Sequence, residues 1–486
     1  MPARTLTEQA AGATVWSAME IASRYGVQFV VTIILARLLS PDDFGLIAML
    51  LVFTSLGTTL ANAGFATALI QRQRPSLDDE TTVFLFTTIT GLLAGVVLWF
   101  SAPLITSFYA QPLLLPLTHF MAITLPIASF AAVPDALLTM KLNFKARARA
   151  EIVASLSSGA VAVGLAWKGY GVWSLAWQVL VASGLRTFLL WLNSAWWPRG
   201  RFRIESFEGL FGFGAYMLLS DLLDTIYLRI QSVLIGKIYD SRALGYYALA
   251  QSTQQAPASL MGGILSRVGL PVFSSVSEQQ GKLLGALRLS QRIAMFLFVP
   301  CMFGIALVAK PLIVMAFGIR WVPAAPILSI LAVSSSFWPM HVLNFAAISA
   351  QGRSKLVFRL ATIQKLAGIA FILISASGGP IMIAWATLAA TLFAVCVTTY
   401  YVSRLLGYGM FLQIHDQLGT FALSIVSAFV GWCALHFMEA SVGATATSIL
   451  SAAAVYLFGA YLIKHAALRE VIALANGLRL KKNHVL

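Results

Sequence analysis

The sequence predicts an all-α integral membrane protein with about fourteen transmembrane helices. Only 10% of the 486 residues are charged, 59% are hydrophobic, and the mean hydropathy is +0.83. Soluble globular proteins carry about 25% charged residues, so this chain has too few charges to cover a water-soluble globule of its size. Apolar runs of about 20 residues, the length that a helix needs to cross the hydrocarbon core, recur along the whole chain.

Turn residues and charges between the apolar runs delimit the expected helices. A polar linker at 197–208 follows the sixth helix, and Pro311–Phe317 is expected to be a loop or the end of the ninth helix. The polar start Met1–Ala11 lacks the apolar core of a signal peptide. The expected spans are 14–38, 43–66, 82–102, 114–135, 150–168, 171–193, 211–236, 244–268, 290–309, 324–348, 357–376, 380–403, 417–438 and 443–463.

The basic residues predict the orientation of these helices. Between the helices, 23 Lys and Arg lie in one alternating set of loops and 6 in the other. Cytoplasmic loops carry the excess of Lys and Arg, so both termini are expected in the cytoplasm. The net charge of +15 comes from these loop residues. It therefore does not indicate binding to nucleic acid, and we expect no nucleic acid partner.

An internal repeat divides the first twelve helices. The stretch Ala36–Met49 aligns without gaps with Gly236–Leu249, at an offset of 200 residues, and Gly45 coincides with Gly245. Six helices separate the copies, which is typical of parallel repeats. We therefore expect an N-terminal lobe at 1–196, the linker, a second lobe at 209–405, and a terminal helix pair with a tail at 406–486.

The sequence offers no motif for catalysis or metal binding. It contains no Walker A, GxSxG or HExxH motif, and no segment between expected helices approaches the size of a catalytic domain. The cysteines Cys301, Cys396 and Cys433 lie far apart in apolar runs, without metal-ligand spacing. We expect a protein that is not an enzyme, with no catalytic residues, no metal and no cofactor.

Polar residues at bilayer depth are the candidate functional residues, because such residues are costly there. The first helix carries Glu20, Arg24 and Gln28 at successive i, i+4 positions, which form one stripe. An internal Glu20–Arg24 ion pair would also explain that stripe.

The seventh helix, the repeat mate of the first, carries a second stripe. Asp221 and Asp224 share one face, Gln231 lies close to it, and Arg229 lies towards its edge. Two such stripes favour a shared central cavity, which the acids Glu20, Asp221 and Asp224 and the glutamines Gln28 and Gln231 would line.

Arg186 in the sixth helix and Lys365 in the eleventh are further intramembrane cations with no acid nearby in sequence. Lys365 is close enough to the cytoplasmic surface to extend its ammonium group into water. Cations in a hydrated cavity would suit phosphate or pyrophosphate and would repel cationic drugs. The cavity cations Arg24, Arg186, Arg229 and Lys365 therefore favour an anionic cargo.

The chain resembles bacterial polysaccharide-transport flippases of the multidrug/oligosaccharidyl-lipid/polysaccharide exporter superfamily. The resemblance rests on Leu35–Met49, Gly64 and Ala68–Gln71, and Gly245–Ala250 with Trp196–Arg203 is similar to the Wzx-type, colanic-acid-exporter branch.

This resemblance implies that the chain moves an undecaprenyl-pyrophosphate-linked oligosaccharide across the inner membrane by alternating access between the lobes. The transported oligosaccharide would serve the synthesis of exopolysaccharide, capsule or O-antigen, the last being part of lipopolysaccharide. It further implies that Arg24, Arg186 and Arg229 engage the cargo, that the acids couple transport to H⁺ or Na⁺, and that polymerase machinery and membrane lipids are partners.

Two alternatives stay open at this point. A multidrug or cation antiporter of the same superfamily would share the fold, although the fixed cations argue against it. A membrane-embedded polysaccharide polymerase or ligase would act on the same lipid carrier, although the short periplasmic loops hold few acids.

Overall fold

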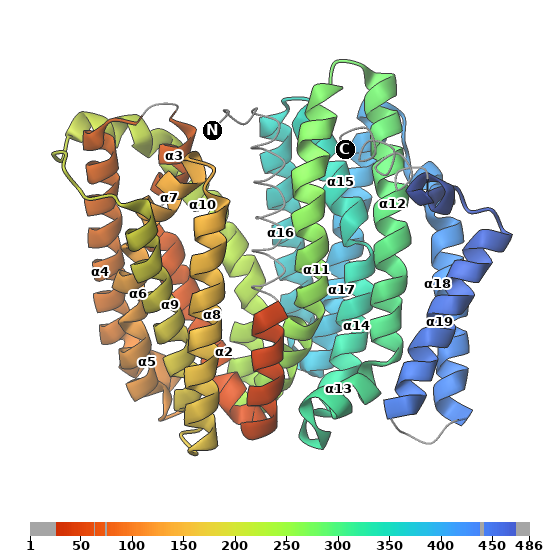
Figure 1. The fold of residues 1–486 in the computed structure, drawn as a ribbon, viewed down its shortest axis with the longest axis horizontal. Coiled ribbons are helices and arrows are strands. Elements are labelled where there is room, and N and C mark those ends of the chain that lie inside the picture. Colours follow the sequence, from red (N-terminus) through yellow and green to blue (C-terminus); the bar gives the residue numbers. More distant parts are fainter. Residues whose placement is uncertain (1–25, 63, 73–74, 438–441, 473–486) are drawn as a thin grey trace, which may run out of the picture. The chain divides into compact units, whose positions relative to one another are not determined.

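The structure, a computed structural model, describes residues 26–62, 64–72, 75–437 and 442–472. Every secondary-structure element within these ranges is helical (Figure 1), so the predicted all-α membrane fold is confirmed. The chain divides into two compact units, Met1–Leu249 and Ala250–Leu486. The predicted lobes, which rest on the sequence repeat, divide the chain elsewhere and stay a prediction.

The range of the first unit includes the whole predicted N-terminal lobe together with the seventh expected helix. The described part of the first expected helix runs from Gly26 to Leu38. The helices that follow are α2 (Pro41–Asn62), α3 (Phe65–Gln71), α4 (Leu77–Tyr109), α5 (Leu114–Ala122), α6 (Thr124–Ser129), α7 (Ala132–Met140), α8 (Phe144–Trp167), α9 (Val172–Ser194), α10 (Ile204–Ile238) and the start of α11 (Ser241–Ser275).

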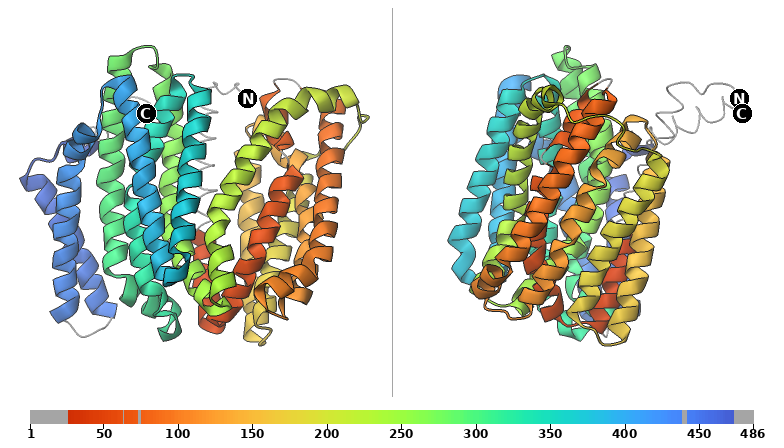
Figure 2. Two further views of the ribbon diagram at one scale, coloured as in Figure 1. Left: turned by 180° about the vertical axis from the view of Figure 1, so that it is seen from behind. Right: turned by 90° about the vertical axis from the view of Figure 1, so that its left-hand side faces the viewer.

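The second unit contains the rest of α11 and the C-terminal helices. Figures 1 and 2 show the last two helices as an antiparallel pair lying side by side. The helices are α12 (Gln280–Leu307), α13 (Ala309–Phe317), α14 (Ala324–Ser336), α15 (Trp338–Ala350), α16 (Ser354–Ser375), α17 (Gly379–Leu406), α18 (Met410–Phe437) and α19 (Val442–Leu462). The segment 311–317, expected as a loop or helix end, belongs to the separate short helix α13.

Ten helical stretches of the described chain are long and apolar enough to cross a membrane. One of them, Lys355–Leu406, contains both α16 and α17. The more polar helices α10 and α11 have 35 residues each, about 52 Å at 1.5 Å per residue, which exceeds the thickness of the hydrocarbon core. The exact number of crossings stays a prediction.

Two expected helices are broken at their prolines. The span 114–135 becomes α5, α6 and α7, and the span 324–348 becomes α14 and α15. A proline removes the backbone hydrogen bond to the residue four positions before it. The breaks at Ile123, Phe130 and Phe337 lie two to four residues before Pro126, Pro134 and Pro339. By contrast, α12 continues through Pro300.

The repeated motif forms a reciprocal contact within the first unit. A Cβ atom on Gly45 would lie 1.7 Å from the backbone oxygen of Ser241, and one on Gly245 would lie 1.9 Å from that of Pro41. The two contacts are equivalent under the repeat, whose copies are 200 residues apart. Asp42 and Arg242 occupy equivalent positions as well, and their Oδ2 and Nε atoms are 3.0 Å apart. Contacts of this self-complementary kind are what a two-fold axis produces.

The motif also begins its helices in the same way in both copies. The Ser40 hydroxyl accepts a bond from the Asp43 backbone N–H, and the Asp43 carboxylate accepts one from the Ser40 N–H. This reciprocal pair caps α2, and Pro41 occupies the first helical position, where its missing N–H costs nothing. In the second copy Asp240 accepts a bond from the Ala243 N–H at 2.6 Å. Helix capping thus accounts for much of the motif.

The linker is fastened to the start of α4. The Trp196 indole donates to Glu80 at 2.6 Å, and the backbone N–H groups of Gly200 and Arg203 donate to the hydroxyls of Thr81 and Thr82. The helix α10 already begins at Ile204, within the predicted linker 197–208. These bonds hold the segment that precedes α10, the helix that carries the predicted acids Asp221 and Asp224, against the start of α4.

Candidate functional site

The helix α10 carries four of the predicted site residues. Asp221 is exposed within the first unit, whereas Asp224 and Arg229 are half-buried. Because charged side chains are expensive against lipid, this face of α10 must lie against water or other polar groups. No hydrogen bond or ion pair of the Arg229 guanidinium is found within the ranges that the structure describes. The helix therefore presents a charged face with a cation available to an anion.

The helix α10 is held by polar contacts to its neighbours. Gln231 is buried, and its amide oxygen accepts a hydrogen bond from the Tyr247 hydroxyl of α11 at 2.9 Å. Thr225, which lies between Asp221 and Arg229 on the helix surface at i, i+4 spacing, is also held, because its hydroxyl is 3.0 Å from that of Thr59 of α2. Gln231, predicted as cavity lining, thus bonds to a neighbouring helix, which fixes the rotation of the charged face.

The predicted partner stripe lies largely beyond the part of the chain that the structure covers. Glu20 and Arg24 fall outside the described residues, and Gln28 is exposed on the helical stretch Gly26–Leu38. Their proposed juxtaposition with α10 stays a prediction.

Arg186 of α9 lies in a cluster of four charged side chains, which we call the Asp135 cluster. Its Nε atom donates to Glu151 of α8 at 3.0 Å and its Nη2 atom to Asp135 of α7 at 3.3 Å. Asp135 also accepts a 2.8 Å bond from Arg147 of α8. Two acids therefore balance two cations. Sequence reasoning placed no acid beside Arg186, because both acids come from other helices.

The Asp135 cluster lies close to the ends of its helices. Glu151 is seven residues from the start of α8 and Arg186 eight from the end of α9, about 10–12 Å at 1.5 Å per residue. The cluster ties α7, α8 and α9 together at that level. Its charge balance favours a structural role for Arg186, and the predicted role of Arg186 in binding cargo stays a prediction.

In the second unit, Lys365 is half-buried on α16. The neighbouring Gln364 donates to the backbone oxygen of Ala394 on α17 at 3.4 Å. The role of Lys365 as a cargo-binding cation is likewise a prediction.

A second cluster of charged side chains joins α12 to α18, and we call it the Asp416 cluster. The Asp416 carboxylate is 5% exposed and accepts two bonds from Arg288, at 2.8 and 2.9 Å, and one from Arg292 at 3.2 Å. The Tyr408 hydroxyl donates to it at 2.8 Å. Arg292 also reaches Glu470 at 3.3 Å. The cluster fastens the terminal helix pair to α12, and the sequence analysis did not single it out.

Tyr408 lies between α17 and α18, outside the membrane-spanning segments. Burial, together with the adjacent Asp416 carboxylate, raises the pKa of its hydroxyl well above the usual range. Tyr408 therefore keeps its proton and remains a hydrogen-bond donor to Asp416.

Buried amides extend this polar connection between helices. Gln291 of α12 donates to Asn344 of α15 at 2.8 Å, and Asn344 donates to Gln413 of α18 at 2.9 Å. All three side chains are fully buried. Polar groups bonded across helices hold membrane bundles together, so this chain of amides is structural.

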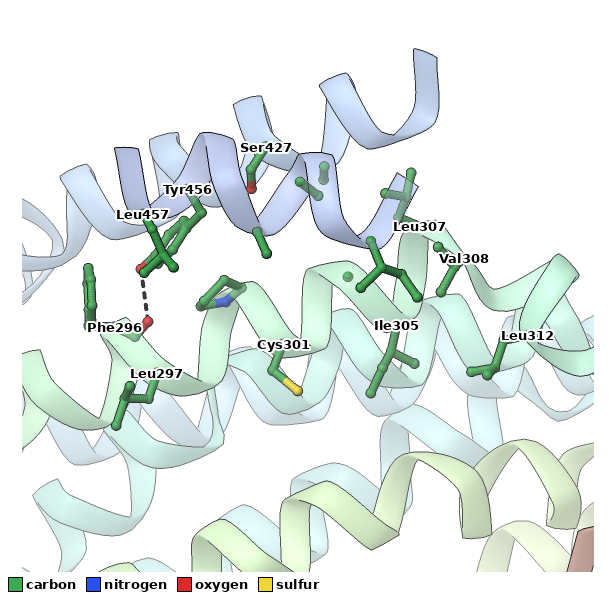
Figure 3. A pocket seen from close by; sticks show the side chains of 16 residues that line it. Phe296, Leu297, Cys301, Ile305, Leu307, Val308, Leu312, Ser427, Tyr456 and Leu457 are labelled. Atoms are coloured by element: carbon green, nitrogen blue, oxygen red, sulfur yellow. Dashed lines mark hydrogen bonds between the residues drawn. The ribbon is translucent and has the colours of Figure 1, made fainter. Parts of the chain in front are cut away.

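An apolar groove runs between α12, α13 and the pair α18 and α19 (Figure 3). Its volume is about 470 Å³ and 16 residues line it. The hydroxyls in its lining are occupied: Tyr456 donates to the Phe296 backbone oxygen at 2.9 Å, and Ser427 donates to that of Ser424 at 3.0 Å. The groove can therefore hold a hydrocarbon chain but offers nothing to bind a charged or sugar group.

The sequence is similar to proteins of bacterial polysaccharide synthesis. Succinoglycan biosynthesis transport protein ExoT of Rhizobium meliloti (strain 1021) is 26% identical over 72% of this chain and 71% of its own. Teichuronic acid biosynthesis protein TuaB of Bacillus subtilis (strain 168) is 26% identical over 93% and 95%. Lipopolysaccharide biosynthesis protein WzxC of Escherichia coli (strain K12) is 25% identical over 68% and 67%.

Solved structures share the fold. Lipid II flippase MurJ in an inward closed conformation superposes with a TM-score of 0.77 at 18% identity, over 95% of this chain and 99% of MurJ. An inward-facing multidrug resistance MATE family transporter gives 0.60 at 15% identity, over 79% and 95%. The family model described as polysaccharide biosynthesis protein matches residues 34–326, more than half of the chain. The predicted resemblance is confirmed, and the chain belongs to this family of polysaccharide biosynthesis proteins.

Proposed function

We propose that this protein moves an undecaprenyl-pyrophosphate-linked oligosaccharide across the bacterial inner membrane for exopolysaccharide, capsule or O-antigen synthesis. Relatives that cover most of the chain carry polysaccharide transport or biosynthesis in their names. Family membership and the fold of a lipid II flippase support the same function. The protein acts as a transporter and not as an enzyme.

The observation that carries the proposal is the contrast between two kinds of surface in one membrane protein. Asp221, Asp224 and Arg229 give α10 a charged face, whereas the groove beside α18 and α19 offers only hydrocarbon. A cargo with a pyrophosphate and sugar head needs the first kind of surface, and its long polyprenyl tail needs the second. A small hydrophilic substrate has no apolar chain that could bind in the groove.

The charged face of α10 suggests how transport is driven. Arg229 offers a guanidinium to the cargo's pyrophosphate, since arginine and phosphate form strong charge-assisted hydrogen bonds. Asp221 and Asp224 then couple the movement of the cargo to an H⁺ or Na⁺ gradient. Alternating access between the predicted lobes, with both termini in the cytoplasm, completes the mechanism.

Lipid analysis of a deletion strain tests this function. We expect the lipid-linked oligosaccharide to accumulate on the cytoplasmic leaflet and the exported polysaccharide to be lost. Plasmid-borne wild-type protein should restore export. A deletion strain with unchanged lipid-linked intermediates and normal export would contradict the proposal.

Variants of α10 test the site separately from the function. Arg229→Gln and Asp224→Asn should each reduce export by at least about tenfold, the loss expected when a charge-assisted bond of about 1.5–3 kcal/mol is removed. Glu208→Gln, an exposed change on the same helix, is the matched control. Full export by both site variants at wild-type protein levels would remove α10 from the mechanism.

A multidrug antiporter is the second candidate, because the acids Asp221 and Asp224 would also attract cations and the MATE fold is shared. Ethidium efflux from cells that express the protein distinguishes the two. Efflux that disappears in Asp224→Asn, with no change in lipid-linked intermediates on deletion, would favour the antiporter.

A further inference from the structure

A basic pocket of the second unit shares no residue with the groove or with the two charged clusters. It is formed by the turn between α15 and α16 and by the last turns of α17, and its volume is about 1000 Å³. We call it the Arg404 pocket. Its lining consists of Gly352, Arg353, Lys355, Leu356, Tyr400, Tyr401, Arg404 and Leu405.

The backbone of the turn places two cations at the mouth of this pocket. Gly352 adopts φ = 72°, a left-handed conformation that glycine adopts without strain, and its N–H bonds to the Ser349 oxygen at 3.0 Å. Arg353 and Lys355 follow at the start of α16 and are exposed. The positive end of the helix dipole disfavours cations there, so their position does not serve the stability of α16.

The third cation is held in place by an aromatic side chain. Arg404 of α17 donates from Nη2 to the Tyr400 hydroxyl at 3.0 Å, and its guanidinium carbon lies 5.4 Å from the centre of the Tyr400 ring. This contact orients the guanidinium without neutralising it. No acid is among the residues that line the pocket, in contrast to Arg147 and Arg288, which pair with Asp135 and Asp416.

The position of the pocket indicates the source of its ligand. Both α16 and α17 belong to a stretch apolar enough to cross the membrane, and the pocket lies where one begins and the other ends. Lipid phosphates lie at this depth, and tyrosines concentrate there. Three cations that share a lining without an acid, among the residues that the structure describes, and that lie beside two tyrosines suit a phosphate ester. Basic pockets between membrane helices bind phosphate-bearing head groups.

We propose that the Arg404 pocket binds the phosphate-bearing headgroup of an anionic membrane phospholipid. The pocket shares no residue with the charged face of α10, so the proposal does not depend on the proposed transport function. Bound lipid would join α15, α16 and α17 at one end of the second unit.

Lipid binding to the purified full-length protein, measured by native mass spectrometry, tests the proposal. The probes are phosphatidylglycerol and phosphatidylcholine with the same acyl chains. Each cation near a charged lipid surface contributes about 1 kcal/mol, and 1.4 kcal/mol corresponds to tenfold. The triple variant Arg353→Gln, Lys355→Gln, Arg404→Gln should therefore bind phosphatidylglycerol roughly 100-fold more weakly. Tyr400→Phe, which removes only the hydroxyl that holds Arg404, should weaken binding a few-fold.

The control is a second triple variant with the same loss of charge, Arg199→Gln, Arg201→Gln, Lys282→Gln, at exposed positions that do not line the pocket. It should bind phosphatidylglycerol like the wild type. Equal losses in both triple variants, or equal binding of phosphatidylcholine by the wild type, would overturn the proposal. Displacement of phosphatidylglycerol by millimolar inorganic phosphate would also overturn it, because the pocket would then be a site for the free anion.

Discussion

The Asp135 cluster and the Arg404 pocket both hold basic side chains near the ends of membrane-length helices, but their surroundings differ. In the Asp135 cluster, Arg147 and Arg186 each bond to acids from a neighbouring helix. In the Arg404 pocket, three cations share a lining without any acid. The cations of these two regions thus differ: those of the Asp135 cluster hold helices together, and those of the Arg404 pocket are left available to an anion. The positive charge of a loop does not by itself tell the two apart.

The largest loss of stability should come from Asp416, which is more buried than Asp135, the acid that gives the other cluster its name. Asp416→Asn leaves Arg288 and Arg292 without the carboxylate that accepts their bonds, and breaking a buried ion pair costs about 3–5 kcal/mol. Because both arginines are partly exposed, we expect the lower end of that range. Thermal unfolding in detergent, followed by tryptophan fluorescence, measures the change. Glu278→Gln, an exposed acid of the same unit, is the control, and equal melting temperatures for the two variants would refute a structural role for the cluster.

Asp135→Asn should also destabilise the protein, but less than Asp416→Asn does. Its carboxylate is 27% exposed, compared with 5% for Asp416. Water can therefore replace part of the hydrogen bonding that the arginines lose with the carboxylate. We expect a loss of about 1–3 kcal/mol, the cost of leaving charged hydrogen-bond groups without partners. The same melting experiment applies. If Asp135→Asn lowers the stability more than Asp416→Asn does, the burial of the acid does not determine how much each cluster contributes to stability.

Exchanging the charges of one pair separates structure from cargo binding. Arg186→Glu alone should destabilise the protein, and adding Glu151→Arg should recover about 1 kcal/mol through the coupling of neighbouring groups. Melting temperature and polysaccharide export are both measured. If stability and export both recover, Arg186 is structural. If stability recovers and export does not, Arg186 acts on the cargo and belongs with the available cations.

Arg404→Gln should have the smallest effect on stability. Arg404 is exposed and no acid lines its pocket, and exposed substitutions usually change stability by no more than about 0.5 kcal/mol. The melting temperature in lipid-free detergent should match that of the wild type. A clear loss of stability would place Arg404 with the structural cations and weaken the comparison.

The fold could be predicted well because the membrane imposes a simple rule on the sequence. A helix that crosses the membrane must be apolar over about 20 residues, and the expected spans overlap the helices that the structure describes, although several helix ends differ by five to ten residues. Prolines lie just after the breaks in the fourth and tenth expected helices, but α12 continues through Pro300. The repeated glycines Gly45 and Gly245 proved to be positions of close backbone approach, although their sequence similarity could not show that they contact each other's motif.

The candidate site could be predicted only in part. The polar face of α10 follows from spacing along one helix, so Asp221, Asp224 and Arg229 could be named as candidates from the sequence, and their role stays a prediction. The partners of Arg186 lie 35 and 51 residues away along the chain, and spacing along one helix cannot show such pairs. A useful signal was present, because Asp135 and Glu151 fall at the edges of expected helices, where an acid needs a partner. The Arg404 pocket was missed because its cations were counted as ordinary loop charges.

Reconstitution into proteoliposomes tests the central claim most directly. Undecaprenyl-pyrophosphate-linked oligosaccharide is placed in both leaflets, an ion gradient is applied, and an impermeant enzyme that cleaves the glycan reports the fraction in the outer leaflet over time. We expect wild-type protein to bring protected cargo to the enzyme much faster than protein-free liposomes, and Asp224→Asn to be slow while Glu208→Gln is normal. Equal rates with and without the protein would contradict the proposed function.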